Sequence, residues 1–464
     1  MIRHFGERTL WLYWEGPKPP YIQLCEELLK LHNETAVVLS PESLLNLGFP
    51  KHIWEVIQGW HVAQRSDAIR TWLLLTFGGM WSDIDCIPMR SFATFIELAK
   101  RCPAGVAVYD STDRTIGVGF IAARRGAEPI RRLWNHIEAV AVSGKYPSWL
   151  EVSTQPFTEI VRDMGREHFL LWPLSHISPV PWYDNDKFLQ RKPDHEHEMF
   201  ARGFPAAWCW MLCNQKLKSS EAVYWTRNEL IHGDSLLSYV IRRSLNHVTR
   251  STVPAKGLAV ATLNVHNDGL PHNFRKSMQH AAERWGAEFV EIRRPIVPWP
   301  DPYWEKLNLD RHLNMYERVV YLDRDVVVRS DCPNLFELVP EETFGLVPSE
   351  QEGHNLIDIH IQPAMDPLCR LLSVNMDYST EYYNSGVMVF SPQLHGQVFQ
   401  IARDLHAIPW VRNWVTIDQG LLALALKITD TPVTRLPPVF NRCGDKLWNH
   451  WQPDMDDYIW HFCG

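Results

Sequence analysis

Hydrophobic and polar positions in the first part of the chain alternate between strand-like and helix-like patterns. Residues 10–14 form an apolar run that ends before Gly16. A proline pair then opens a helical pattern over residues 19–31, and residues 36–40 form a second apolar run. A strand, a helix and another strand in this order are typical of the parallel sheet of a nucleotide-binding domain.

The same order of elements starts again in the second half. Residues 246–257 are polar and small and carry a proline and a glycine, which is typical of a domain boundary. Residues 258–263 and 288–293 are apolar runs separated by a helical pattern. We therefore predict an α/β protein with two tandem domains, residues 1–250 and 251–464, each built on a Rossmann-like, mostly parallel sheet.

Two aspartates interrupt an apolar stretch of the second half, Arg318–Arg329. Its apolar residues predict one strand buried on both faces, where unpaired carboxylates would be costly. Asp323 and Asp325 are therefore expected where the strand leaves the core, and residues two apart in a strand point the same way. Paired carboxylates predict a site for a hard divalent cation, Mg²⁺ or Mn²⁺, with open positions for phosphate.

A second Asp-x-Asp triplet, formed by Asp83 and Asp85, follows an apolar run near the N-terminus. Before it, residues 61–77 follow a helical pattern that places Asp67 and Arg70 on one face, and a glycine pair ends this helix. Taken alone, Asp67 and Arg70 would be a surface ion pair. Because the triplet follows, we favour a role beside a metal site, with Asp67 on the nucleotide sugar and Arg70 on its phosphates or the neighbouring carboxylates.

Composition narrows the classes of function. The chain has 464 residues, of which 45% are apolar and 22% are charged, as in globular domains. A net charge of −8 argues against a nucleic-acid partner, since such a surface needs a basic excess. Nine scattered cysteines favour reduced thiols and a cytoplasmic protein. No transmembrane segment is visible, so any membrane association would be peripheral, at the inner face of the membrane, or through a partner.

Histidine and glutamate alternate in Asp194–Glu198, and such a run could bind a metal. In a polar stretch beside proline it is more often a solvated loop, which is the interpretation that we favour.

The motifs of the first half resemble the capsular polysaccharide synthesis family and the related sugar-transferase family 32, whose glycosyltransferases contain the DXD motif. The shared pattern stands here as Tyr13–Pro17, Ser66–Arg70, Gly78–Trp81 and Asp83–Asp85. The resemblance weakens toward residue 215, and a late histidine expected near Trp208–Trp210 is absent. It implies a GT-A-like domain in which Asp83 and Asp85 hold the metal.

The second half resembles glycosyltransferase family 8, which includes glycogenin, across nearly all of residues 257–464. The family's motifs stand in order as Tyr321–Val328, Asn384–Met388, Asp418-Gln419 and His461–Gly464. The family's last motif normally continues to a lysine that holds the diphosphate, whereas this sequence stops at Gly464. Another cation would then do that work, or catalysis at this site would be weaker.

This resemblance implies a role for several residues. Asp323, Asp325 and His461 would be metal ligands, and Asp323 would also touch the ribose. Lys306, on a predicted helix over residues 304–313, would meet the sugar or its phosphate. Asn384, Asp418 and Gln419 would line the transferred sugar.

Together the resemblances imply a retaining, metal-dependent hexosyltransferase with Mn²⁺ (or Mg²⁺) and a nucleotide-sugar donor, with UDP-sugar as the family-based expectation. We expect a bifunctional enzyme that acts on a polysaccharide, lipooligosaccharide or other glycan acceptor. The alternative is one active domain with the other serving as a scaffold or glycan-binding module. The two triplets argue against a lectin-like protein, and the lack of a Gly-rich triphosphate loop argues against a nucleotidyltransferase.

Overall fold

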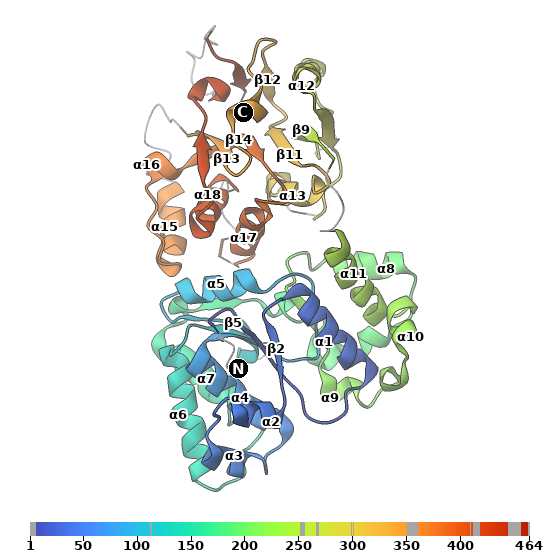
Figure 1. Cartoon of the computed structure of the whole chain (residues 1–464), viewed down its shortest axis with the longest axis vertical. Helices are drawn as coiled ribbons and strands as arrows, with labels where there is room; N and C mark the ends of the chain where they lie inside the picture. Colours follow the sequence, from blue (N-terminus) through green and yellow to red (C-terminus); the bar gives the residue numbers. More distant parts are fainter. Residues whose placement is uncertain are drawn as a thin grey trace. The chain divides into compact units, whose positions relative to one another are not determined.

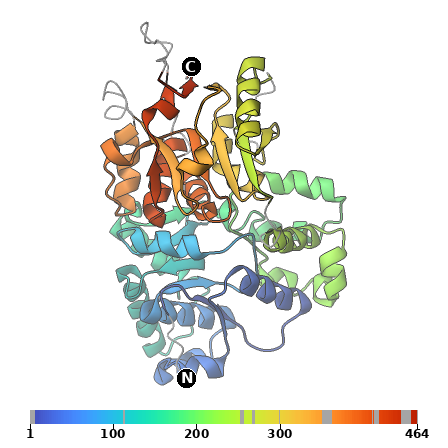
Figure 2. The same ribbon diagram turned by 45° about the horizontal axis from the view of Figure 1, so that its top comes forward.

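Two compact units make up the chain: residues 1–250 with 371–373, and residues 251–370 with 374–464. The computed structural model describes residues 6–111, 114–250, 256–265, 269–297, 299, 301–349, 361–408, 410–411, 418–443 and 456–462. Figures 1 and 2 show a central sheet with helices packed around it in each unit.

The first unit is built on a six-stranded sheet with the order β2-β1-β3-β6-β5-β7. β1 is parallel to β2 and β3, β5 is parallel to β7, and β6 is antiparallel to β3 and β5. β4 and β8 form a separate antiparallel pair. The strands are β1 (Leu10–Tyr13), β2 (Ala36–Leu39), β3 (Gly79–Ser82), β4 (Cys86–Pro88), β5 (Val106–Asp110), β6 (Ile116–Ala123), β7 (Leu170–Trp172) and β8 (Cys209–Met211).

Helices cover both faces of this sheet, because alternate residues of its strands point to opposite sides. On β6, Ile121 joins the core beneath α4 and α6, whereas Phe120 packs against Phe92 and Phe95 at α5. The helices are α1 (Pro20–His32), α2 (Pro41–Asn46), α3 (Lys51–Ile57), α4 (Val62–Phe77), α5 (Ala93–Arg101), α6 (Glu128–Val142), α7 (Thr154–Met164), α8 (Asp194–Arg202), α9 (Asn214–Leu217), α10 (Arg227–His232) and α11 (Leu236–Arg250), with the 3-10 turns η1 (Arg166–His168), η2 (Leu174–His176), η3 (Trp182–Leu189) and η4 (Glu221–Tyr224).

The second unit repeats this sheet strand for strand, in the order β10-β9-β11-β14-β13-β15. β9 is parallel to β10 and β11, β13 is parallel to β15, and β14 is antiparallel to β11 and β13. β12 and β16 flank β17 in a small separate sheet. The strands are β9 (Leu258–Leu263), β10 (Glu288–Ile292), β11 (Arg318–Leu322), β12 (Val326–Val328), β13 (Phe344–Pro348), β14 (Tyr383–Phe390), β15 (Val433–Arg435), β16 (Arg442–Cys443) and β17 (Ile459–His461).

Helices of the second unit lie on its sheet in the same way. α12 packs against β9, β10 and β12, and α18 packs against β14 and α17. The helices are α12 (His272–Arg284), α13 (Leu309–His312), α14 (Leu335–Leu338), α15 (Gln362–Leu371), α16 (Tyr378–Glu381), α17 (Gly396–His406) and α18 (Asp418–Thr429), with the 3-10 turns η5 (Pro302–Asn308) and η7 (Pro438–Phe440). The prediction of an α/β protein with two mostly parallel sheets in tandem is confirmed.

Three local predictions were wrong. The stretch 318–329 is not one strand, because a turn over Asp323–Asp325 separates β11 from β12. The stretch 194–198 is not a loop but the start of α8, where Pro193 precedes the first turn and His197 is buried. Residues 304–313 are not one helix, since η5 ends at Asn308 and α13 spans Leu309–His312.

Among the residues that the structure describes, no helix is both long enough and apolar enough to cross a membrane.

Candidate functional site

A turn between β11 and β12 carries the two aspartates of the second unit. β11 is buried on both faces up to Leu322, and the turn closes with a 3.2 Å hydrogen bond from the Val326 amide to the Asp323 carbonyl. The carboxylates therefore converge through a turn and not through the two-residue period of a strand. This explains how buried strands can deliver charged groups without burying them in the core.

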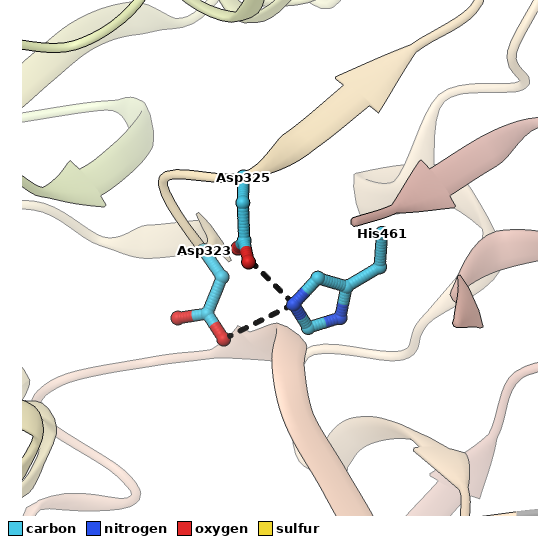
Figure 3. A group of neighbouring side chains, drawn as sticks. All are labelled: Asp323, Asp325 and His461. Atoms are coloured by element: carbon cyan, nitrogen blue, oxygen red, sulfur yellow. Dashed lines mark ion pairs between the residues drawn. The ribbon is translucent and has the colours of Figure 1, made fainter. Parts of the chain in front are cut away.

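His461, the last residue of β17, faces these carboxylates. Its Nε2 atom lies 3.2 Å from Asp325 Oδ1 and 3.6 Å from Asp323 Oδ2 (Figure 3). β17 is antiparallel to β12, with His461 opposite Val326, and the Phe462 amide donates to the Asp325 carbonyl at 2.9 Å. Backbone pairing therefore fixes the histidine beside the turn.

The other ring nitrogen of His461 is held by Asn441. His461 Nδ1 donates to Asn441 Oδ1 at 3.0 Å, an assignment that follows from the amide oxygen being an acceptor. Nε2 therefore faces the carboxylates, and in the neutral form of the ring this atom carries the lone pair that a metal-ligating histidine requires. Asp323, Asp325 and His461 each offer a ligand atom within 4.8 Å of the others. Two carboxylate oxygens and one imidazole nitrogen fit Mn²⁺.

Lys306 links this cluster to the start of α18. Its Nζ atom donates to Asp323 Oδ2 at 2.7 Å and to Ser385 Oγ at 3.1 Å, and it lies 3.7 Å from Asp418 Oδ2. The Ser385 hydroxyl donates to Asp418 Oδ2 at 2.8 Å. Burial alone would lower the pKa of Lys306, but Asp323 and then Asp418 hold that pKa above its usual value. The lysine therefore stays charged.

Carboxylates outnumber the lysine in this cluster, because the single ammonium group of Lys306 faces the carboxylates of Asp323, Asp325 and Asp418. Burial would raise the pKa of Asp325, but its hydrogen bond to His461 and the charge of that ring lower the pKa below its usual value. A deprotonated Asp325 is the form that binds a cation.

Gly386 in β14 leaves room for the histidine. A Cβ atom at this position would lie 2.3 Å from His461 Cε1 and 2.6 Å from Nδ1, and the Gly386 carbonyl accepts from the Asp323 amide at 2.8 Å. Asn384 Oδ1 accepts from the Gly386 amide at 2.7 Å, which places Asn384 beside the cluster. Gln419 follows Asp418 in the first turn of α18.

Three residues of this cluster were missed from the sequence: Tyr321, Ser385 and Asn441. The Tyr321 hydroxyl donates to Asp323 Oδ1 at 2.7 Å. Tyr321 and Ser385 stand inside the motifs Tyr321–Val328 and Asn384–Met388, so their presence was visible, whereas Asn441 lies outside those motifs. Their contacts depend on chain crossings that a linear pattern does not show.

The first unit repeats the turn between β3 and β4. Trp81 Nε1 donates to Asp83 Oδ1 at 2.8 Å, as Tyr321 does to Asp323. Arg70 Nη2 lies 2.8 Å from Asp67 Oδ1 and 3.5 Å from Asp83 Oδ1. Asp67 and Arg70 are buried, so they are not the surface ion pair of the simplest sequence interpretation.

Asp85 is held by the backbone amide of the first residue of α9. Its Oδ2 atom accepts from the Asn214 amide at 2.5 Å, and the side chain of Asn214 accepts from Tyr21. Burial, and secondarily the charge of Asp83, raises the pKa of Asp85 to about 6. Burial also raises the pKa of Asp67 to about 6, even though Arg70 opposes the rise. In the first unit, Arg70 therefore contacts both Asp67 and Asp83, while Asp85 is held by Asn214.

A hollow of about 610 Å³ opens at the carboxyl ends of β1 and β2. Its lining comes from the end of β2 and from the segments that directly follow the two strands, with the residues Trp14, Glu15, Gly16, Lys18, Ser40, Pro41 and Ser43. Ligands of open α/β sheets bind at this edge.

Comparisons with known proteins concern the second unit most directly. The family model described as glycosyl transferase family 8 matches residues 302–464. This match supports glycosyl transfer as the function of the unit that contains those residues. No curated protein matches the chain. The resemblance of the first half to the capsular and family 32 enzymes stays a prediction.

Three solved structures are similar to parts of the chain, and each covers 45% of it. One is a glycosyltransferase involved in the glycosylation of the major capsid of PBCV-1, at 11% identity, TM-score 0.31 and 95% of that chain. Another is the galactosyltransferase LgtC in complex with donor and acceptor sugar analogs, at 13% identity, TM-score 0.31 and 87% of that chain. A third is mouse xyloside xylosyltransferase 1, at 14% identity, TM-score 0.28 and 98% of that chain.

Proposed function

We propose that the second unit transfers a sugar from a nucleotide diphosphate sugar, with UDP as the expected nucleotide, to a glycan acceptor. The observation that carries this proposal is the Asp323, Asp325 and His461 cluster, which lies inside the region that matches glycosyl transferase family 8. Asp323, Asp325 and His461 would hold Mn²⁺ or Mg²⁺. A cation bound there supplies Lewis-acid neutralisation of the charge that develops on the leaving diphosphate.

The remaining residues of the cluster would shape the sugar side of the site. Tyr321 and Lys306 hold the Asp323 carboxylate from two directions, so its orientation is set before substrate binds. Asp418, whose carboxylate accepts a hydrogen bond from the Ser385 hydroxyl, would offer negative charge to the oxocarbenium character that develops on the sugar. Asn384 and Gln419 would line the transferred sugar, and we expect retention of the anomeric configuration.

We propose that the first unit is a second transferase domain, which would make the enzyme bifunctional. The repeated sheet order, the repeated aspartate turn and the hollow at the ends of β1 and β2 support this proposal. If only one unit is active, the other is a scaffold or glycan-binding module.

UDP release from a panel of UDP-sugars with Mn²⁺, with and without glycan extracts, tests both proposals. Asp83→Ala/Asp85→Ala and Asp323→Ala/Asp325→Ala would each abolish a different donor activity if the enzyme is bifunctional. Exposed Asp331→Ala, in the same unit as the second pair, is the matched control and should retain both activities. Loss of every activity in one double variant alone would mean one active unit. No turnover with any donor in the wild type would overturn glycosyl transfer.

A further inference from the structure

Met211 in the first unit occupies the position that His461 occupies in the second. Both residues end a strand that is antiparallel to the strand after the aspartate turn: Met211 lies opposite Cys86, and His461 lies opposite Val326. The residue after each one closes the same hydrogen bond, since the Leu212 amide donates to the Asp85 carbonyl at 2.8 Å. The corresponding bond from Phe462 to Asp325 measures 2.9 Å.

The side chains also point to the same place. Gly119 in β6 accepts from the Asp83 amide at 2.8 Å, as Gly386 does from Asp323. A Cβ atom on Gly119 would lie 2.9 Å from Met211 Cε and 2.6 Å from Asp83 Oδ2. The terminal methyl group of Met211 therefore lies over this glycine beside the aspartate turn, as the imidazole of His461 lies over Gly386 in the second unit.

The residue that orients the histidine is replaced as well. Asn441 directly follows η7, whereas Ile177 directly follows η2 in the first unit. The Ile177 carbonyl accepts from the Met211 amide at 3.2 Å, so the two residues are neighbours. Asp85 Oδ2 in turn accepts a hydrogen bond from the Asn214 amide at 2.5 Å.

We propose that Met211 is the residue that makes the two units differ in cation binding. The second unit binds one Mn²⁺ through its own three ligands, whereas the first unit binds Mn²⁺ at least tenfold more weakly. The reason is that a thioether is a poor ligand for a hard cation. This inference rests on the proposed metal role of the aspartate turns. Since the second unit would hold Mn²⁺ more tightly, a limiting Mn²⁺ concentration would favour the reaction of the second unit over that of the first.

Electron paramagnetic resonance counts free Mn²⁺ in the absence of any donor, so the test does not depend on turnover. The full-length wild type should bind one Mn²⁺ tightly. His461→Met should weaken that site at least tenfold, and Met211→His/Ile177→Asn should add a second site of similar affinity. Exposed His52→Met is the matched control for His461→Met and should bind like the wild type.

Two equal sites in the wild type, or a tight site that persists in His461→Met, would overturn the proposal. A folded Met211→His/Ile177→Asn protein that still binds one Mn²⁺ would overturn the role of Met211. If that double variant does not fold, the wild-type stoichiometry and His461→Met decide. One tight, His461-dependent Mn²⁺ without sugar transfer would leave this inference standing while the proposed function fails.

Discussion

The two units share a scaffold but differ at the residue that faces the aspartate turn. In both, an aromatic residue two positions earlier holds the first aspartate, and a buried cation from a preceding segment approaches it: Arg70 in one unit and Lys306 in the other. In both, a glycine carbonyl accepts from the first aspartate's amide. The residue that faces the turn differs: it is Met211 in the first unit and His461 in the second. Identical topology therefore does not make the two sites chemically equivalent.

The largest effect is expected from removing the first aspartate of each turn. Asp323→Asn should lower the donor turnover of the second unit about a thousandfold, because the amide removes a cation ligand and the partner of Lys306. Asp83→Asn should leave that activity within about twofold, since it belongs to the other unit. Initial rates with the donor sugar whose turnover depends on Asp323 measure the effect of both variants. Equal losses in the two variants would contradict the separation of the sites.

The sequence singled out Asp323, Asp325, Lys306 and His461, which the structure brings together, because family motifs and buried strands mark them along the chain. It did not predict how Asp323 and Asp325 converge, since apolar residues on both sides of the triplet resemble one strand. The turn forms because the charged residues avoid burial. The absence of a late histidine near Trp208–Trp210 was visible, but identifying Met211 as its replacement required the pairing of β8 with β4.

Glycine substitutions test whether the residue that faces the aspartate turn, Met211 or His461, acts differently in the two units. Gly386→Ala should displace the His461 ring and weaken Mn²⁺ binding about tenfold, because its Cβ would overlap Cε1 and Nδ1. Gly119→Ala, the matched variant, would displace Met211 and the Asp83 carboxylate and should leave the tight Mn²⁺ site unchanged. Calorimetric titration with Mn²⁺ measures the two affinities. Weaker binding in Gly119→Ala alone would reverse the assignment.

The pH dependence of stability should differ between the units. Burial raises the pKa of Asp67 from 3.8 to about 6, so between these values the folded state holds more protons than the unfolded state. Its contribution to the free energy of unfolding therefore rises as pH falls from 7 to 4. Asp325, with a lowered pKa, stabilises above the unfolded value and loses that contribution as pH falls through its folded pKa.

Asp67→Asn removes the first of these contributions. The gain in unfolding free energy between pH 7 and pH 5 should shrink by about 1–2 kcal/mol in this variant. Amide exchange of α4 in the full chain, corrected for intrinsic rates and read by mass spectrometry, measures the change. Exposed Asp163→Asn is the control. An unchanged pH response in Asp67→Asn would show that Asp67 is not the titrating group.

The smallest effect is expected at the hydroxyl that links Lys306 to Asp418. Ser385→Ala should lower kcat/KM of the second unit only about fivefold, equivalent to about 1 kcal/mol. The loss is small because Lys306 and Asp418 still face each other without the hydroxyl that links them. Val118 stands at the same place before the glycine of β6, where Arg70 donates to its backbone carbonyl at 2.6 Å. Val118→Thr should therefore leave the first unit's activity unchanged. A larger loss from Val118→Thr than from Ser385→Ala would contradict this difference.

Anomalous scattering from Mn²⁺ in crystals of the full chain, grown without nucleotide, tests the difference between the two sites most directly. We expect one strong peak, bounded by Asp323, Asp325 and His461, and none of comparable height at Asp83 and Asp85. Two equal peaks, or a peak at Asp83 and Asp85 alone, would contradict the conclusion that the shared scaffold holds unlike sites.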